Sequence, residues 1–215
     1  MRTHFDAQLA TLNNELILMG SLCENAIAKA SQALHDHSKD MAFNVYKSDT
    51  VVDKKERDIE ALCLSLILHQ QPIASDLRFI SAALKMITDM ERIADQASDI
   101  AEITLNFDFD EAGDISLIDE MAKATIKMVN GCIDAYIKRD LKTAQDVLEH
   151  DDEVDEFFYK IKTQLVERIR AHDQDGQTSL DLLMIAKYLE RIGDHACNIA
   201  QWVIFAITGN HKNEE

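Results

Sequence analysis

The chain has 215 residues, 47% hydrophobic and 28% charged, a composition typical of a globular protein that excludes a disordered chain. Its formal net charge of −17 disfavours nucleic acid and anionic membrane surfaces as partners and suits cations or basic protein surfaces. There is no apolar run of membrane-spanning length and no signal-peptide core near Met1, and the four cysteines are scattered singly, so we expect a cytoplasmic protein with reduced thiols.

One proline and six glycines in such a length favour long helices. Apolar residues recur with helical period almost throughout, and they predict six helices, at about 5–37, 40–69, 75–105, 116–138, 141–171 and 178–208. The predicted fold is all-α, with two tandem antiparallel three-helix bundles related by internal duplication. The predicted domains are residues 1–105 and 116–215, joined by a linker at 106–115.

Breaks between the helices carry recognisable signals. Pro72 lies in the first hairpin turn, and Asp173–Gly176 (DQDG) forms the second. Helix caps are predicted at Ser75, at Thr178 or Ser179, and in a capping box at Ser116-x-x-Asp119. Phe107 and Phe109 in the linker are expected to dock between the bundles, with docking on a partner as the alternative.

One segment of the chain is written twice. Met90–Glu102 (MERIADQASDIAE) returns as Leu189–Gln201 (LERIGDHACNIAQ), 99 positions later, and each copy contains Glu-x-x-x-Asp. An upstream pair of aspartates repeats at an offset of 102. The repeated acids are Asp49, Asp53, Glu91 and Asp95 in the first half, and Asp151, Asp155, Glu190 and Asp194 in the second.

These acids fall within or beside the apolar sectors of their helices, where an unpaired charge is costly. Asp53 and Glu91 are equidistant from Pro72, and so are Asp49 and Asp95; the second-half acids are equidistant from the DQDG turn in the same way. We therefore expect four carboxylates to converge at one level in each bundle.

Carboxylates gathered in this way repel one another unless they are neutralised, and hard multivalent cations with oxygen ligands are their natural counter-ions. The predicted ligands are the eight repeated acids, and the predicted cofactor is a divalent or ferric ion: Fe, Zn, Mn or Mg. Protonated acids, water-bridged acids or a merely wet groove are the alternatives. Arg92 and Arg191 are expected to project away from the acids, and His195 towards solvent.

The chain contains no Glu-x-x-His, which argues against a ferritin-like di-iron oxidase, and no catalytic motif is found. No catalytic residues are therefore predicted. A carboxylate-bridged metalloenzyme and a purely structural scaffold are the remaining alternatives from the residues alone.

The segments at 189–200 (LERIGDHACNIA) and 70–95 (QQPIASDLRFISAALKMITDMERIAD) resemble the PhoU family over nearly the whole chain. The family's Glu(or Asp)-x-x-x-Asp metal motif matches all four acid pairs. Ala94 and Gln96 depart from the Gly193 and His195 of the second copy, and the second half lacks a clear Gln-Pro-x-Ala segment, so the two sites need not be equal.

The resemblance implies regulation without catalysis: a protein that is not an enzyme but a cytoplasmic, often dimeric negative regulator of phosphate transport and phosphate homeostasis. Its expected partners are the ATPase subunit of the phosphate ABC transporter, a sensor histidine kinase and a second copy in a homodimer. The alternative is an accessory protein of a phosphate permease that works without an ATPase.

Overall fold

The computed structural model describes residues 2–70, 72–111, 113–171 and 176–210. Within them the chain forms six long α-helices and one short 3₁₀-helix. These are α1 (Arg2–His35), α2 (Lys39–Gln70), α3 (Ala74–Asn106), η1 (Phe109–Glu111), α4 (Ser116–Lys138), α5 (Leu141–Ala171) and α6 (Gly176–Thr208). The predicted all-α class and the six predicted helices are confirmed, and no described helix is long and apolar enough to cross a membrane.

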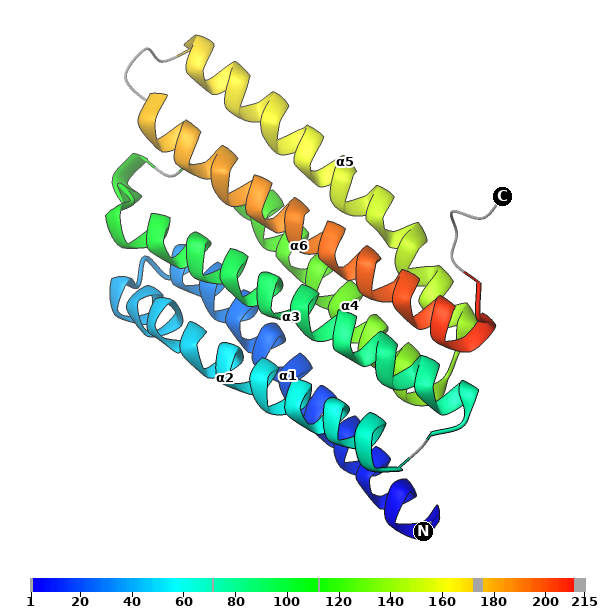
Figure 1. Ribbon diagram of the computed structural model, residues 1–215. Coiled ribbons are helices and arrows are strands. Elements are labelled where there is room, and N and C mark those ends of the chain that lie inside the picture. The colour runs from blue at the N-terminus through cyan, green and yellow to red at the C-terminus, as the bar shows by residue number, and fades with distance from the viewer. Residues whose placement is uncertain (1, 71, 112, 172–175, 211–215) are drawn as a thin grey trace.

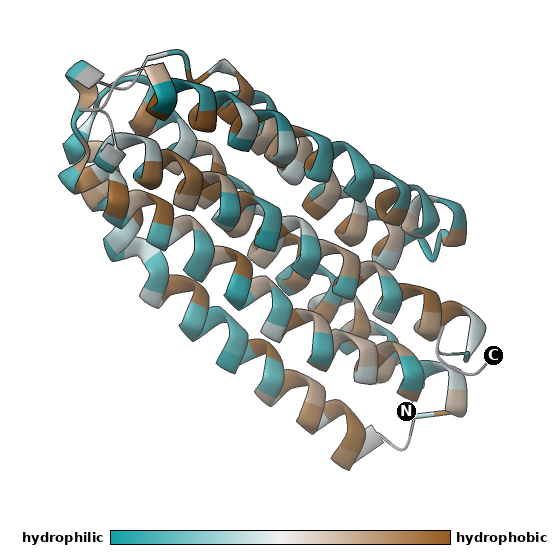
Figure 2. Ribbon diagram, turned by 90° about the horizontal axis from the view of Figure 1, so that it is seen from above, coloured by the Kyte–Doolittle hydropathy of each residue, from teal (hydrophilic) through white to brown (hydrophobic). Residues whose placement is uncertain are grey.

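Each half is a bundle of three helices that pack on one another, α1 with α2 and α3, and α4 with α5 and α6. The halves also pack together, because α3 lies along α6 and α1 along α4, while α2 and α5 form the two outer edges (Figure 1). Hydrophilic and hydrophobic residues alternate along every helix (Figure 2), and the buried hydrophobic residues form one continuous core through both halves.

Helices α3 and α6 run antiparallel. Lys85 lies against Trp202 with Nζ 5.9 Å from the ring centroid, and further along α3 the carboxylate of Asp89 accepts a hydrogen bond from Asn198 at 3.2 Å. Towards the C-terminal end of α3, Asp99 lies near Tyr188 of α6. Burial is the main cause that raises the pKa of the Tyr188 phenol, and the charge of Asp99 is the next. In these contacts the residue numbers rise along α3 while they fall along α6. The two duplicated segments therefore lie side by side and antiparallel at the centre of the molecule.

The helix starts differ from the predicted caps. Helix α3 begins at Ala74, after Ile73 and without a side-chain cap, so the cap predicted at Ser75 is wrong. Helix α6 begins at Gly176, which leaves Thr178 and Ser179 buried inside the helix. Residues 172–175 of the predicted DQDG turn lie outside the described residues.

The predicted capping box of α4 is also wrong. The backbone N–H of Ser116 donates to Asp114 Oδ1 at 3.0 Å, so Asp114 satisfies the first turn. Asp119 instead accepts from Ser31 Oγ at 3.2 Å and pairs with His35 Nδ1 at 2.8 Å. Its carboxylate therefore joins the start of the second half to the end of α1, a contact between segments that local sequence patterns do not report.

The linker carries aromatic side chains into the first half. Phe107 is buried and packs edge-to-face on Phe109, with 5.4 Å between ring centroids. Phe109 stacks on His37, which follows α1, at 4.6 Å, and Lys39 Nζ lies 5.9 Å from its centroid. The linker is thus held on the loop between α1 and α2.

Candidate metal centre

Helices α2 and α3 bring carboxylates together in the first half. One carboxylate oxygen from each of Asp49, Asp53 and Asp95 lies within 4.8 Å of the other two. We call these three residues the first carboxylate group. The register inferred from equal distances to Pro72 is the observed one, since Asp49 and Asp95 face each other closely enough to share a hydrogen bond.

Asp49 is the most perturbed member of the group. Burial raises the pKa of its carboxyl to about 6, and the charges of Asp95, Asp53 and Asp99 act in the same direction. Its Oδ1 atom is buried without a hydrogen-bond partner. A buried oxygen with no partner beside two further carboxylates is costly unless a proton or a cation neutralises it.

Glu91 lies beside the first carboxylate group but supplies no atom to the 4.8 Å cluster. Burial, and next the charge of Asp95, raises the pKa of Glu91. Arg92 does not project away as predicted, because Nη1 lies 2.8 Å from Asp95 and Nε lies 3.4 Å from Glu91. Its long side chain folds back over the helix and neutralises part of the group from the solvent side, where it is 55% exposed.

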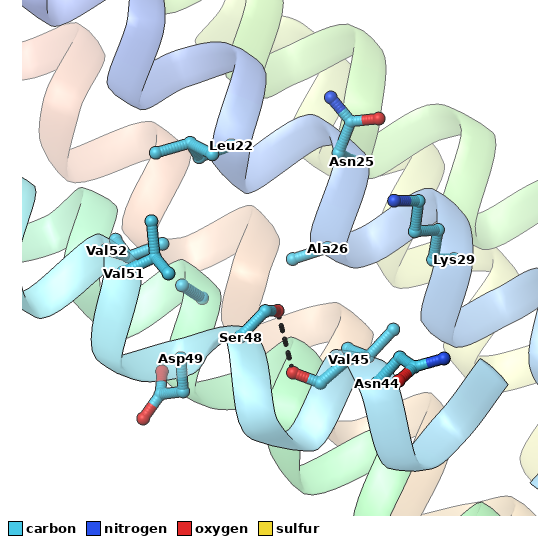
Figure 3. A pocket seen from close by; sticks show the side chains of 11 residues that line it. Leu22, Asn25, Ala26, Lys29, Asn44, Val45, Ser48, Asp49, Val51 and Val52 are labelled. Carbon is cyan, nitrogen blue, oxygen red and sulfur yellow. Dashed lines mark hydrogen bonds between the residues drawn. The ribbon is translucent and has the colours of Figure 1, made fainter. Parts of the chain in front are cut away.

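A crevice of about 170 Å³ lies next to Asp49, between α1 and α2 (Figure 3). Leu22, Val51 and Val52 form its apolar walls, and Asn25 and Lys29 contribute polar atoms. Figure 3 shows the Asp49 carboxylate directed away from the α1 side chains that line the crevice. Asp49 thus lines the crevice while its carboxylate turns away from the α1 wall.

The corresponding acids of the second half are more loosely placed. Asp151 is half-buried, and burial raises its pKa, with Asp155 and Asp194 acting in the same direction. Asp155 and Asp194 are exposed, and Glu190 contacts the ammonium of Lys187. Asp151, Asp155, Glu190 and Asp194 form the second carboxylate group, and they do not bring three ligand atoms within 4.8 Å, although all four lie in the described part of the chain.

Two neighbours of the second carboxylate group were not identified from the sequence. The thiol of Cys197 shares a hydrogen bond with Asp151, and burial, followed by the Asp151 charge, raises the Cys197 pKa to about 12. Gly193 lets α5 approach closely, since a Cβ there would stand 3.3 Å from Asp151 Oδ1. The repeat pointed to both positions, because Cys197 stands where the first copy has Ser98, and Gly193 where it has Ala94.

His195 does not project towards solvent as predicted. Its side chain is 20% exposed, and Nδ1 lies 2.9 Å from Asp89 Oδ1 on α3. The helical wheel placed His195 outside its own bundle correctly, but the neighbouring bundle covers that side. His195 thus connects the two halves.

The donor set suits a hard cation. The first carboxylate group offers oxygen ligands at spacings that a metal ion can bridge, and its buried Asp49 oxygen lacks any other partner. Asp49, Asp53 and Asp95 would hold the ion, with Glu91 at the edge, and the ion would supply positive charge and a cross-link between α2 and α3. The fold and the repeated acid pairs define a class of all-helical proteins built from two tandem three-helix repeats with an acidic motif in each.

Comparison with known proteins identifies the family. The PhoU domain model matches residues 16–104 and again residues 118–203. The chain is 36% identical over 211 residues to a phosphate-specific transport system accessory protein PhoU homolog of Clostridium acetobutylicum, covering 97% of this chain and 96% of that one. It is 29% identical to the Escherichia coli accessory protein PhoU, covering 95% and 86%. The chain belongs to the PhoU family.

Solved structures agree with this assignment. The crystal structure of PhoU from Pseudomonas aeruginosa matches 96% of this chain and 100% of its own, with a TM-score of 0.89 and 31% identity. The phosphate transport system regulatory protein PhoU from Streptococcus pneumoniae also has a TM-score of 0.89, with 25% identity. The architecture of tandem bundles is thus shared over nearly the whole length.

Proposed function

We propose that this chain is a non-catalytic, metal-binding, cytoplasmic negative regulator of phosphate uptake and phosphate-starvation signalling. Support comes from its relatives, which are named accessory or regulatory proteins of phosphate transport. The observation that carries the metal part is the first carboxylate group, with its buried and unpartnered Asp49 oxygen.

The bound ion would act as a structural counter-charge. Asp49 and Asp53 belong to α2 and Asp95 to α3, so an ion between them holds the two helices at a fixed spacing. It also removes the repulsion among like charges that the metal-free protein must bear. Metal binding would in this way set the shape and charge of the surface that partners meet.

The proposed partners are the ATPase subunit of the phosphate ABC transporter, a sensor histidine kinase and a second copy of this chain. A net charge of −17 suits a basic surface on a partner and speeds encounter with it. Affinity capture by the tagged protein should retain the transporter ATPase and the kinase. Capture of a phosphate permease without an ATPase would instead favour the alternative role.

Metal analysis of the purified protein tests the metal part. Protein prepared without chelator should contain divalent or ferric ions by elemental analysis, and Asp53→Ala with Glu91→Ala should remove most of the metal of the first group. A matched control is Asp58→Ala with Glu60→Ala, which removes two exposed acids from α2 at a distance from the group. Wild-type protein that stays metal-free after incubation with Mn²⁺ and Fe³⁺ would contradict the proposal.

Removal of the gene tests the regulatory part. Loss of a negative regulator should raise phosphate uptake or the expression of phosphate-starvation genes in phosphate-rich medium. Reintroduction of the wild type should restore both. Unchanged uptake and expression in the deletion strain would contradict the regulatory role, whatever the metal content of the protein.

A further inference from the structure

A lysine occupies part of the second carboxylate group. Lys187 lies one turn before Glu190 on α6, and its ammonium contacts the Glu190 carboxylate, whose side chain is only 17% exposed. Lys187 Nζ also lies 5.5 Å from the centroid of the Phe158 ring on α5. Lys187 is therefore held between an aromatic ring and one of the proposed metal ligands.

The first half has neither of these contacts. The duplication places Thr88 at the position of Lys187 and Glu56 at the position of Phe158. There the Thr88 hydroxyl donates to Glu56 Oε1 at 3.3 Å, and the Glu56 charge contributes to the raised pKa of Glu91. At these two positions the first half has the acid Glu56, whereas the second half has the cation Lys187 and the aromatic ring of Phe158 that contacts it.

The net charge around the acids is also less negative in the second half than in the first. Relative to the first half, Lys187, Phe158 and Asn198 each make the second group more positive by one unit, since they replace Thr88, Glu56 and Asp99. Asp152, which replaces Thr50, returns one negative unit. By these replacements alone the second carboxylate group is two units more positive than the first, before the contacts of the arginines are counted.

Arg92 reduces this difference to one unit, which still leaves the second group attracting cations less strongly than the first. It pairs with Glu91 and Asp95, yet Asp95 still contributes an oxygen to the three-carboxylate cluster. Its counterpart Arg191 lies close enough to Asp99 for their charges to interact, so it serves the contact between the halves. In the second half the side chain that pairs with the acids is therefore Lys187. It stands at a different position of the repeat from Arg92, which pairs with the acids in the first half.

We propose that Lys187, held by Phe158, competes with metal ions for Glu190 and makes the second carboxylate group the weaker of two metal sites. This inference rests on the proposed metal binding and assigns an order of affinity to its two sites. An ion that binds there must displace the ammonium from Glu190 and then remain near its charge. The first carboxylate group fills at lower metal concentration.

Exchange of the matched residues tests the proposal. Mn²⁺ titration by calorimetry is done with Asp49→Asn and Asp53→Asn in place, so that the second group alone is measured. Lys187→Thr is expected to tighten Mn²⁺ binding about tenfold, and adding Phe158→Glu is expected to tighten it further. Lys187→Arg keeps the charge and should stay weak. The reciprocal Thr88→Lys with Glu56→Phe, in the otherwise wild-type chain, should weaken the first group.

Lys160→Thr is the matched control. Lys160 resembles Lys187 in its contacts, with Nζ 2.9 Å from Glu156 and 5.6 Å from the Phe157 ring centroid, but these partners lie outside the second group. The Lys160→Thr substitution removes one positive charge, as Lys187→Thr does, and should leave Mn²⁺ binding unchanged. Equal Mn²⁺ affinity before and after Lys187→Thr would overturn the role of Lys187 while metal binding stands. Absence of Mn²⁺ binding from the wild type and from every variant would overturn the proposed metal function itself.

Discussion

Asp49 is the residue at which the proposed metal site costs the metal-free protein stability. Its carboxyl is partly buried, faces two further carboxylates, and has one oxygen without a partner. Because burial and like charges oppose ionisation, the folded protein binds the Asp49 proton more strongly than the unfolded chain does. At the proposed metal site an ion would supply the missing counter-charge, so the same residue would destabilise the metal-free protein and stabilise a metal-bound one.

The substitution Asp49→Asn separates these two effects. With a chelator present at neutral pH, it should raise the free energy of unfolding by about 1 kcal/mol, a value reduced for solvent screening of a half-exposed group. The folded pKa of about 6 lies above the ordinary 3.8, so the wild type should lose stability relative to Asp49→Asn as pH rises from about 4 to about 6. Chemical denaturation across this pH range measures the difference. Parallel pH profiles for the two proteins would contradict the raised pKa.

The sequence located the acids better than the cations. Equal distances from Pro72 predicted the level at which Asp49 meets Asp95, because helix geometry fixes where a short side chain lies. Arg92 carries a long, flexible side chain that folds back onto Glu91 and Asp95, and a helical wheel gives only the direction of its first bond. The contact of Lys187 with Glu190 and Phe158 was missed for the same reason.

At the scale of the helices, α5 and α6 approach each other closely at Gly193. A Cβ at Gly193 would stand 3.3 Å from Asp151 Oδ1, which is tighter than most Cβ contacts in proteins, and 3.4 Å from Val154 Cγ1, which is at the edge of ordinary van der Waals contact. Glycine therefore allows the Asp151 carboxylate to sit directly against the α6 backbone. Helix positions were predictable from periodicity, but this spacing and the contacts of Asp119 were not, since both depend on neighbours distant in the chain.

Gly193→Val should push α5 and α6 apart. Its branched side chain meets Asp151 and Val154, and overpacking of this kind costs about 1–3 kcal/mol. The control is Gly176→Val, at a position where a Cβ meets nothing within 4 Å. Denaturant titrations followed by circular dichroism compare the two variants. A Gly193→Val protein as stable as the control variant would show that the helices do not approach so closely.

At the scale of the whole molecule, the two halves share one core. The repeat predicted that the halves resemble each other, but a repeat carries no information on how they are oriented. The antiparallel packing of α3 on α6 is given by tertiary contacts such as those of Asp89 with His195 and of Lys85 with Trp202. Since the buried residues are continuous across this interface, we expect the halves to unfold together.

Leu16→Ala tests this cooperativity. Leu16 is fully buried in α1, so its truncation should cost about 2–5 kcal/mol. Trp202, the single tryptophan, lies in α6 of the other half against Lys85 of α3, so its fluorescence reports on α6 where the two halves meet. The Trp202 transition should shift to lower denaturant together with the loss of helix by circular dichroism. A Trp202 transition that stays in place would mean that the halves unfold separately.

The crossing of the two repeats at the centre of a single polypeptide has an evolutionary consequence. If each repeat were a separate chain paired with an identical copy, every mutation would appear in both copies, and both acidic motifs would change in step. Covalent fusion removes that constraint. One repeat carries Thr88 and Glu56 where the other carries Lys187 and Phe158, so that two similar bundles in one chain present chemically distinct acidic groups.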